Sequence, residues 1–425
     1  MTLEKHAERT IAFSPPDYTE AEVEAVAEVI RSGWITTGPK TKLFEQKLAE
    51  QAGAQGVACL NSATSALECG LRALGIGPGD EVITSAYTYT ASASVIVHVG
   101  ATPVLCDTAL DSYEMDYAQL AELITDKTKA VIPIDIAGLM CDYDKLRAIL
   151  ESKRELWKPA NDIQKHFDRV IILADAAHSF GASYKGHASG AVADFTSFSF
   201  HAVKNVTTAE GGALAWKDNG FDSGEFYQNI MNLSLHGQTK DALSKTKAGS
   251  WEYDIAFPGW KCNMTDIQAA LGLVQLERYP GMLERRKEIV KRYEKALDSI
   301  GVDVELIQHK PDEGVSSCHL MLVRLTGHGS DFRNRVIQLM AEQGVSTNVH
   351  YKPLPMLTAY KDLGFNIADF PNAYAQYKNE ITLPLHTLLT DEDVDYIAEA
   401  LKSAYAETAR NHVSVCVPAE SRGFI

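Results

Sequence analysis

The chain has 425 residues, 45% of them hydrophobic and 23% charged, which is typical of a globular protein with a large domain and a smaller one. Its formal net charge of −16 argues against nucleic acid as a partner, because a phosphate backbone requires a basic protein surface. Met1 to Thr10 is polar and no apolar stretch is long enough to cross a bilayer, so we predict a cytoplasmic protein without a membrane partner.

Strand and helix patterns alternate through the first two-thirds of the chain. Short apolar runs predict strands, in chain order, at 57–60, 79–84, 129–134, 169–174 and 195–200. Apolar residues at helical spacing predict a helix at 117–125. This alternation is typical of an α/β fold with a mainly parallel sheet covered by helices. In such folds, ligands bind beyond the carboxyl ends of the strands.

Three regions lack a strand pattern. Residues 150–168 are charged, and we expect an elaborated helix there, before the strand at 169–174. Residues 217–250 are polar and contain glycine, which predicts loops over the surface. Residues 412–425 combine an apolar run with Pro418 and Gly423, and this pattern predicts neither a helix nor a strand.

A long helix is expected from Asp266, interrupted at Pro280-Gly281 and resuming over 282–300. Strand-like and helical pieces follow it. We therefore divide the chain into a large domain, 1–275, and a small C-terminal domain, 276–425, on which the N-terminal segment could pack.

Seven cysteines are scattered along the chain, and none forms a Cys-x-x-Cys pair. The odd number and wide spacing predict reduced, mostly buried thiols, with neither a zinc site nor a disulfide framework. We expect no bound metal.

Asp175 lies at the end of the strand at 169–174 and is followed by Ala176-Ala177-His178. A carboxylate at the carboxyl end of a strand points into the ligand crevice. An aspartate that faces the pyridine nitrogen of pyridoxal phosphate keeps that nitrogen protonated, which makes the ring an electron sink. The alternative is a helix N-cap, a position that favours aspartate.

Lys204 follows a strand rich in phenylalanine and serine and lies between apolar segments. A lysine that forms a Schiff base needs a partly deprotonated amine, and burial lowers its pKa accordingly. Ser199, five positions earlier, could bind a phosphate oxygen. Considered alone, a lysine is more often a solvated surface charge, so this interpretation depends on the neighbouring motifs.

Two further segments follow predicted strands. Residues 61–66 are small, and three of the six carry a hydroxyl. They open a helix whose free N–H groups suit an anion, although capping alone would explain them. Tyr87 and Tyr89 follow the next strand, where a ring could stack on a flat cofactor or simply pack on the core. The chain order of these four features fits one pyridoxal-phosphate site: a phosphate-binding helix start, an aromatic residue, an aspartate and a lysine.

Longer motifs carry a family resemblance over most of the chain. The run from Phe198 to Gly212 contains Lys204 and the sequence Thr-Thr-Ala-Glu-Gly-Gly. It resembles the lysine segment of the DegT/StrS-type sugar aminotransferases, which are fold-type-I pyridoxal-phosphate enzymes. Further similar segments lie at 32–39 with Phe44-Glu45, and at 134–142, 259–270 and 349–354.

The resemblance implies the fold-type-I architecture, in which helices sandwich the mainly parallel sheet of a large domain and a smaller α/β domain follows. It implies pyridoxal 5'-phosphate as cofactor, with Lys204 as the catalytic lysine and Asp175 at the pyridine nitrogen. It further implies that His178 lies near the phenolic oxygen of the cofactor and that Tyr89 stacks on the ring. The phosphate would be held by Ala63, Thr64 and Ser199.

The resemblance also implies a second subunit. Asn263 would reach the phosphate of the neighbouring subunit's cofactor, which makes the protein a homodimer with active sites at the interface. Without the family match, a loop residue or a helix cap would be the preferred interpretation of Asn263. The implied substrate-side residues are Trp34, Thr37, His350 and Tyr351.

The implied reaction moves an amino group from an amino acid to a keto sugar. L-glutamate is the family's usual donor, and the acceptor would be a nucleotide-linked 4-keto or 3-keto deoxysugar on the way to a cell-surface polysaccharide. Alternatives are a sugar dehydratase, another fold-type-I enzyme such as a desulfurase or aldolase, and a non-catalytic cofactor-binding regulator. The dehydratases have histidine in place of Lys204, no cysteine stands out for a desulfurase, and a regulator would not need residues 34–39 or 350–351.

Two positions depart from the family pattern. Ala209 stands where many members have glycine, and we expect little effect because the backbone there only needs room. Asp135 replaces a histidine that is common in the middle loop, which leaves the substrate contact at that position open.

Overall fold

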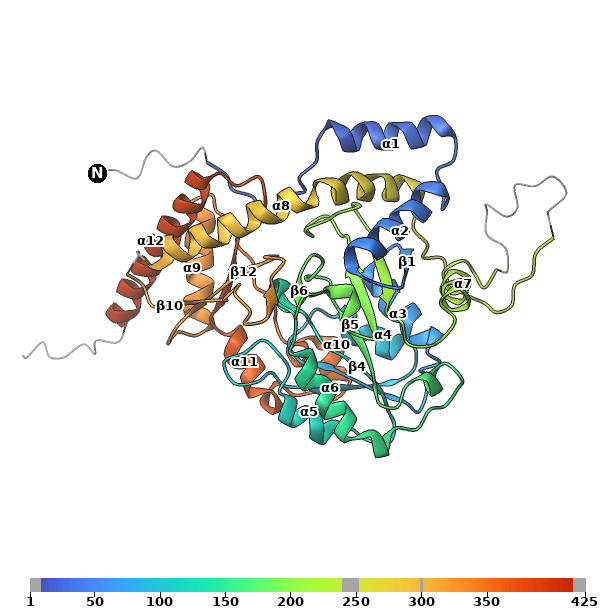
Figure 1. The fold of residues 1–425 in the computed structure, drawn as a ribbon. Coiled ribbons are helices and arrows are strands. Elements are labelled where there is room, and N and C mark those ends of the chain that lie inside the picture. The colour runs from blue at the N-terminus through green and yellow to red at the C-terminus, as the bar shows by residue number, and fades with distance from the viewer. Residues whose placement is uncertain (1–8, 239–251, 299–300, 416–425) are drawn as a thin grey trace, which may run out of the picture.

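The computed structural model describes residues 9–238, 252–298 and 301–415 of the chain (Figure 1). Its centre is a seven-stranded sheet with the order β1-β9-β8-β5-β4-β2-β3. The pairs β8–β5, β5–β4, β4–β2 and β2–β3 are parallel, whereas β9 runs antiparallel to both of its neighbours. In chain order these strands are β1 (Gly56–Leu60), β2 (Glu81–Ser85), β3 (Thr102–Cys106), β4 (Thr128–Ile132), β5 (Ile171–Asp175), β8 (Phe195–Ser199) and β9 (Gly212–Trp216).

The predicted strands are confirmed. All five lie within two residues of β1, β2, β4, β5 and β8, and the helix predicted at 117–125 is α5 (Tyr117–Leu123). Every residue of β4 and β5 is buried, as expected for strands covered on both faces. The sequence patterns missed β3 and β9.

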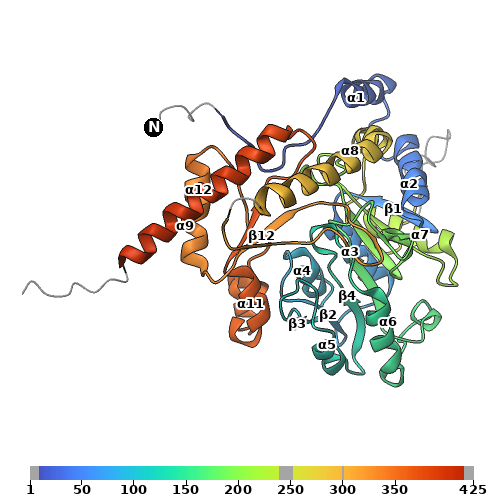
Figure 2. The same ribbon diagram turned by 60° about the vertical axis from the view of Figure 1, so that its left-hand side comes forward.

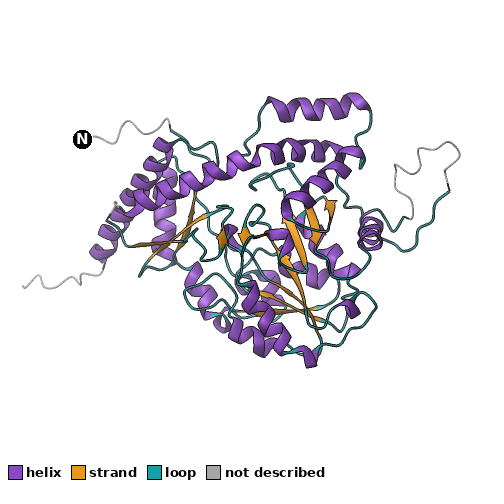
Figure 3. Cartoon of the chain, viewed as in Figure 1, coloured by secondary structure: helices purple, strands orange, loops and turns teal. Residues whose placement is uncertain are grey.

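Helices lie on both faces of this sheet (Figure 3). They are α2 (Pro39–Ala52), α3 (Ala63–Ala73), α4 (Ala91–His98), α5, α6 (Tyr143–Ser152), α7 (Ser223–Ser234) and the long α8 (Asp266–Asp298). α1 (Glu20–Ser32) packs on the outer side of α8 (Figure 1). Two other strands, β6 (Ser183–Tyr184) and β7 (His187–Ala188), form a small sheet with β11 (Gly314–Val315). Among the described residues, no helix is both long and apolar enough to cross a membrane.

Two predictions about the regions between strands are wrong. The segment 217–250 is not all loop, because α7 occupies Ser223–Ser234, while 239–251 lies outside the described residues. Asp222 caps α7, and Phe226 and Ile230 are buried one turn apart, a helical spacing that polar neighbours obscured. Residues 150–168 do not extend a helix, since α6 ends at Ser152 and only two short 3-10 turns follow.

The prediction of a break at Pro280 is also wrong. α8 runs without interruption from Asp266 to Asp298, with Pro280 inside it. A proline costs about 3 kcal/mol in a helix interior because it removes one hydrogen bond and crowds the preceding turn. Tyr279 and Met282 are buried on either side of it, and α1 and α2 pack along the helix (Figure 1), so tertiary packing outweighs that cost.

A smaller unit follows α8. Its antiparallel sheet has the order β10-β12-β13, and α9 and α12 lie side by side next to it (Figure 2). Its hydrophobic core also takes up the second half of α8 and Ile11, which forms a parallel bridge with Val345. The division at residue 276 stays a prediction. Besides β11, the elements after α8 are β10 (Val304–Leu306), β12 (Met321–Leu325), α9 (Ser330–Glu342), α10 (Thr358–Asp362), α11 (Pro371–Tyr377), β13 (Glu380–Leu383) and α12 (Asp391–Val415). Of these, α10 and α11 pack against the hydrophobic core of the large sheet.

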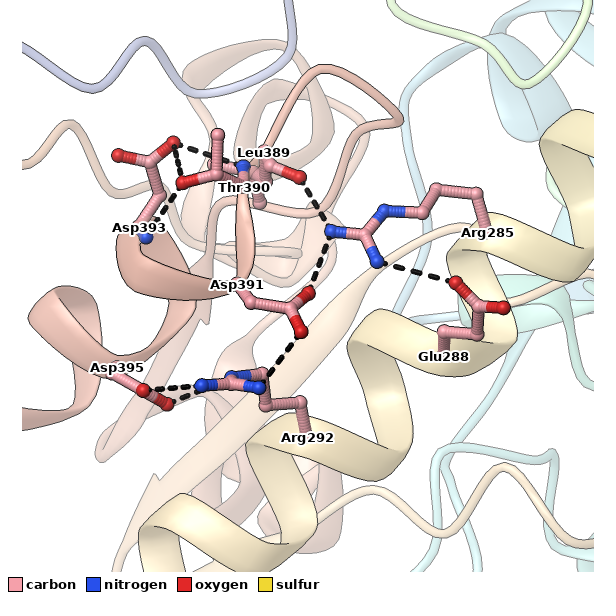
Figure 4. A network of polar contacts seen from close by, with 8 residues as sticks. All are labelled: Arg285, Glu288, Arg292, Leu389, Thr390, Asp391, Asp393 and Asp395. Atoms are coloured by element: carbon pink, nitrogen blue, oxygen red, sulfur yellow. Dashed lines mark hydrogen bonds and ion pairs between the residues drawn. The ribbon is translucent and has the colours of Figure 1, made fainter.

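An exposed ion-pair network joins α8 to the start of α12 (Figure 4). Arg285 of α8 donates to the Leu389 carbonyl (2.7 Å) and to Asp391 (2.9 Å). Arg292, two turns further on, pairs with Asp391 at 2.8 Å and with Asp395 at 2.9 Å. The long helix is thereby tied to the small unit by charges as well as by apolar contacts.

Candidate active site

A cavity of about 450 Å³ opens beyond the carboxyl ends of β1, β2, β4, β5 and β8. This is the edge at which a parallel sheet presents residues to a ligand. Nine of the twelve site residues predicted from the sequence line it, namely Ala63, Thr64, Tyr89, Asp175, His178, Ser199, Lys204, His350 and Tyr351.

Lys204 projects from the turn after β8 into this cavity. Its backbone N–H donates to the His201 carbonyl at 2.9 Å. Burial lowers the pKa of the Lys204 amine to about 8, against the opposing pull of Asp175. A fraction of the amine is therefore neutral near pH 7, as a nucleophilic lysine requires.

Asp175, the last residue of β5, is 7% exposed and holds a fixed position. The Ser92 hydroxyl donates to one of its oxygens at 2.6 Å, and the Ala177 N–H donates to the other at 3.1 Å. Burial raises the pKa of Asp175, although both hydrogen bonds and Lys204 lower it. A buried carboxylate is stabilised by a positive charge nearby, and a protonated ring nitrogen placed in this cavity would supply that charge.

His178 is neutral, because burial and the nearby Lys204 lower its pKa well below the usual value. Its Nδ1 accepts the Ala137 N–H at 3.3 Å, so the ring proton lies on Nε2. Nε2 lies 3.0 Å from the Tyr351 hydroxyl and can donate to it. The Tyr351 hydroxyl proton is then available to a group in the cavity.

The N-terminus of α3 offers an anion site at the cavity wall. Ser62 caps the helix by accepting the Ser65 N–H at 3.1 Å, while Ala63 and Thr64 line the cavity. The helix dipole and free N–H groups at such an end favour a phosphate. Gly212 of β9 permits this arrangement, since a Cβ there would lie 2.3 Å from the Ala63 nitrogen.

Trp34, Thr37 and Asn263 do not line the cavity of their own chain. The Asn263 amide donates to the Thr37 hydroxyl at 2.6 Å, and the Trp34 indole N–H donates to the Thr37 carbonyl at 3.2 Å. The three predicted residues thus form one cluster that joins the segment before α2 to the segment before α8. Their contact with a ligand stays a prediction.

Asp266 anchors this cluster, although the sequence predicted it only as the start of the long helix. Its carboxylate accepts the N–H groups of Gly38 (2.8 Å) and Thr41 (2.9 Å), so it caps α2 from the start of α8. Ser92, which holds Asp175, was missed in the sequence. Neither role has a local sequence signal, because the partners lie far away along the chain.

The prediction that position 209 only needs room is wrong. Ala209 has a φ of 66°, in the left-handed region that favours glycine. A side chain there costs about 1 kcal/mol or more. The family's usual glycine therefore meets a conformational requirement that Ala209 satisfies with strain.

Asp135 does not line the cavity. Its carboxylate accepts hydrogen bonds from the Ser179 hydroxyl (2.7 Å), the Cys141 N–H (3.0 Å) and the Tyr143 hydroxyl (3.0 Å). Burial raises the pKa of Asp135 to about 6. The residue braces the loop after β4 and the turn that carries His178.

Comparisons with known proteins agree with this geometry. The model of the DegT/DnrJ/EryC1/StrS aminotransferase family matches residues 16–402. The spore coat polysaccharide biosynthesis protein SpsC of Bacillus subtilis is 37% identical over 396 residues, 92% of this chain and 96% of its own.

Solved structures give the same result. The putative sugar aminotransferase Spr1654 of Streptococcus pneumoniae, in its PMP form, has a TM-score of 0.91 and 55% identity, covering 94% of this chain and 100% of its own. Its PLP form has a TM-score of 0.90. PseC of Helicobacter pylori, an aminotransferase involved in the biosynthesis of pseudoaminic acid, has a TM-score of 0.81 and 28% identity, covering 94% and 100%.

Proposed function

The chain belongs to the DegT/DnrJ/EryC1/StrS aminotransferase family, and from this premise we propose that it transfers the amino group of L-glutamate to a nucleotide-linked keto sugar. It is a pyridoxal-phosphate-dependent sugar aminotransferase with the fold of such enzymes. The acceptor that we propose is a 4-keto or 3-keto deoxysugar that becomes part of a surface polysaccharide, as the relation to SpsC supports.

The observation that carries this proposal is the pairing of a buried carboxylate and a buried amine in one cavity. The fit to the cofactor follows from the donor set: Lys204 would bind it covalently, and Asp175 would face its ring nitrogen. Its phosphate would meet Ala63, Thr64 and Ser199, and its ring would contact Tyr89 and His178. When bound, pyridoxal phosphate supplies an electron sink for charge that develops on the carbon next to the reacting nitrogen.

The residues of the chain supply proton transfer and position. The Lys204 amine, with a pKa of about 8, can take a proton from the reacting carbon and return it, since its pKa lies near the working pH. Asp175 would keep the ring nitrogen protonated. Tyr351, which accepts from His178, would donate its hydroxyl proton towards the substrate side of the cavity.

We also propose that the active unit is a cytoplasmic homodimer. Trp34, Thr37 and Asn263 form a cluster outside the cavity of their own chain, so they would serve the cavity of a second copy. Sedimentation of the full chain and of an Asn263→Ala variant tests this, with cofactor affinity as the second measurement. A monomeric wild type that binds the cofactor tightly would exclude the shared site.

The experiment for the central proposal is an absorbance titration of the purified protein with pyridoxal phosphate. We expect a visible band that L-glutamate removes and that the correct keto sugar restores. A band that glutamate leaves unchanged would contradict the donor, with the cofactor site retained. A Lys204→Ala variant is the control, since it should lack the band that depends on covalent attachment.

A further inference from the structure

A layer of buried polar side chains lies behind the cavity and contacts His178, which lines it, and Asn205, which follows Lys204. Its centre is the segment 317–319, which precedes β12. The Ser317 hydroxyl donates to the His178 carbonyl at 2.5 Å, and the His319 N–H donates to the Ala137 carbonyl at 2.9 Å. Neither Ser317 nor His319 lines the cavity itself. The layer therefore contacts the proposed cofactor site only through other residues.

Asn205 connects this layer to the lysine. It follows Lys204 directly and is 5% exposed. Its amide nitrogen donates to the Ser317 carbonyl at 2.7 Å, which leaves the amide oxygen facing His319. That oxygen lies 2.9 Å from Nδ1 of His319, so Nδ1 must carry the ring proton and donate it.

The other side of the His319 ring contacts His178. The ring centroids lie 4.5 Å apart with an interplanar angle of 39°. Burial, together with His178 and Lys204, holds the pKa of His319 well below its usual value, so two neutral rings pack together without repulsion. One side chain thus contacts both the residue after Lys204 and His178, which lines the cavity.

We propose that His319 and Asn205 are a positioning pair that fixes the Lys204 amine relative to His178, and hence relative to the substrate carbon. This inference rests on the proposed function, because the fixed geometry matters only if Lys204 transfers the proton. The turn that carries Lys204 lies outside the sheet, and the Asn205 side chain anchors it to the Ser317 carbonyl. A displacement of about 1 Å at a reacting group can cost about a hundredfold in rate.

His309 provides a matched control. It is 8% exposed, compared with 4% for His319, and it lies ten residues earlier in the chain. Its ring nitrogens pair with the Ser316 hydroxyl (2.7 Å) and the Leu320 carbonyl (2.9 Å). Removal of either histidine should therefore cost similar stability. Of these two histidines, His319 contacts Asn205 and His178, whereas His309 pairs with Ser316 and Leu320.

The variants compared are His319→Leu, which removes the donor, His319→Asn, whose amide nitrogen can replace Nδ1, and His309→Leu. For His319→Leu we expect kcat to fall about 10–100-fold with little change in KM, and we expect His319→Asn to recover most of the loss. His309→Leu should lower the melting temperature and leave kcat within about threefold.

A second readout needs no turnover. Acetylation of Lys204 in the cofactor-free protein, followed by mass spectrometry across pH, measures the pKa of its amine. The titratable groups that face this amine are Asp175, His178, His319 and His350. Loosening the turn admits water, so His319→Leu should raise this pKa by about one unit, whereas His309→Leu should not.

The outcomes test the positioning pair and the proposed transamination separately. If the pKa of Lys204 and kcat are as in the wild type after His319→Leu, the positioning pair is wrong. If His309→Leu lowers kcat equally, the effect is general destabilisation and the proposal is again overturned. Should the wild type bind pyridoxal phosphate but fail to transaminate, the proposed function fails, and the acetylation result still stands as a test of the pair.

Discussion

Two groups of charged residues behave differently in this molecule. In the network between α8 and α12 every charge has an opposite partner, and the side chains remain between 28% and 52% exposed for Arg285, Asp391 and Asp395. At the cavity, Lys204 and Asp175 are withdrawn from water. Burial lowers the pKa of Lys204 and raises that of Asp175, so both move toward neutral pH. Basic and acidic side chains therefore join two elements at one place and are suited to proton transfer at the other, because burial changes the free-energy cost of a charge.

The largest effect that would test this contrast is the loss of the amine. Lys204→Ala should reduce transamination by at least about 10³-fold, because it removes both the attachment of the cofactor and the proton carrier. Steady-state rates with L-glutamate and a keto sugar measure it. Lys217→Ala is the control, since burial also lowers the pKa of Lys217, which pairs with Asp194 away from the cavity. Equal losses would show that any half-buried lysine matters.

The next effect concerns the carboxylate. Asp175→Asn should lower kcat by roughly 10²–10³-fold, because a neutral amide no longer stabilises a protonated ring nitrogen. Asp135→Asn is the matched variant, with a carboxyl group that is also buried and has a raised pKa but does not line the cavity. It should destabilise the fold by about 1–3 kcal/mol and change kcat by less than about fivefold. Similar kcat losses in both variants would contradict the distinction between Asp175, which lines the cavity, and Asp135, which only holds the neighbouring loop in place.

Sequence patterns predicted the parts of the site that follow strand ends. Asp175 and the start of α3 come directly after apolar runs, and Lys204 follows the end of β8 by five residues. The chain direction places all three at one edge of the sheet. Ser92, Asn205 and His319 could not be found this way. Their roles depend on partners more than 80 residues away, which no local pattern encodes.

The same limit explains the errors in the fold. The break expected at Pro280 followed from local helix propensity, whereas packing of α1 and α2 along α8 decides the outcome. At Ala209 the error was of another kind, because the family's usual glycine was attributed to room for the backbone and not to the left-handed φ that the position has. Local propensity is a weak guide wherever tertiary contacts or strain determine the backbone.

A third prediction uses pH to separate the two regions. The pKa of Lys204 is lowered in the folded chain from 10.5 to about 8. Its contribution to stability is therefore complete above pH 10.5 and is lost as pH falls through 8. Relative to Lys204→Ala, the cofactor-free wild type should gain up to about 3 kcal/mol in the free energy of unfolding between pH 8 and 10.5. Urea denaturation of both proteins at the two pH values measures this gain. If the free energy of unfolding changed equally with pH in the wild type and in the variant, a lowered pKa of Lys204 would be contradicted.

The smallest effect belongs to the surface network, and two arginines of α8 sharpen the comparison. Arg292→Met should lower the free energy of unfolding by about 0.5–1 kcal/mol at low salt and by less than half of that in 1 M NaCl, because exposed pairs are screened. Arg286, six residues earlier, is 3% exposed and donates to the carbonyls of Leu385 (3.0 Å), Cys318 (3.3 Å) and His319 (3.4 Å).

Burial lowers the pKa of Arg286 to about 10, and no carboxylate is among these acceptors. Arg286→Met should therefore cost about 2–4 kcal/mol, independently of salt, because the three carbonyls lose their shared donor in a place that water does not reach. Urea denaturation of both variants at two salt concentrations decides the matter. If the loss for Arg286→Met were as small and as salt-sensitive as that for Arg292→Met, then the identity of the side chain, and not its burial, would govern what a charge contributes in this fold.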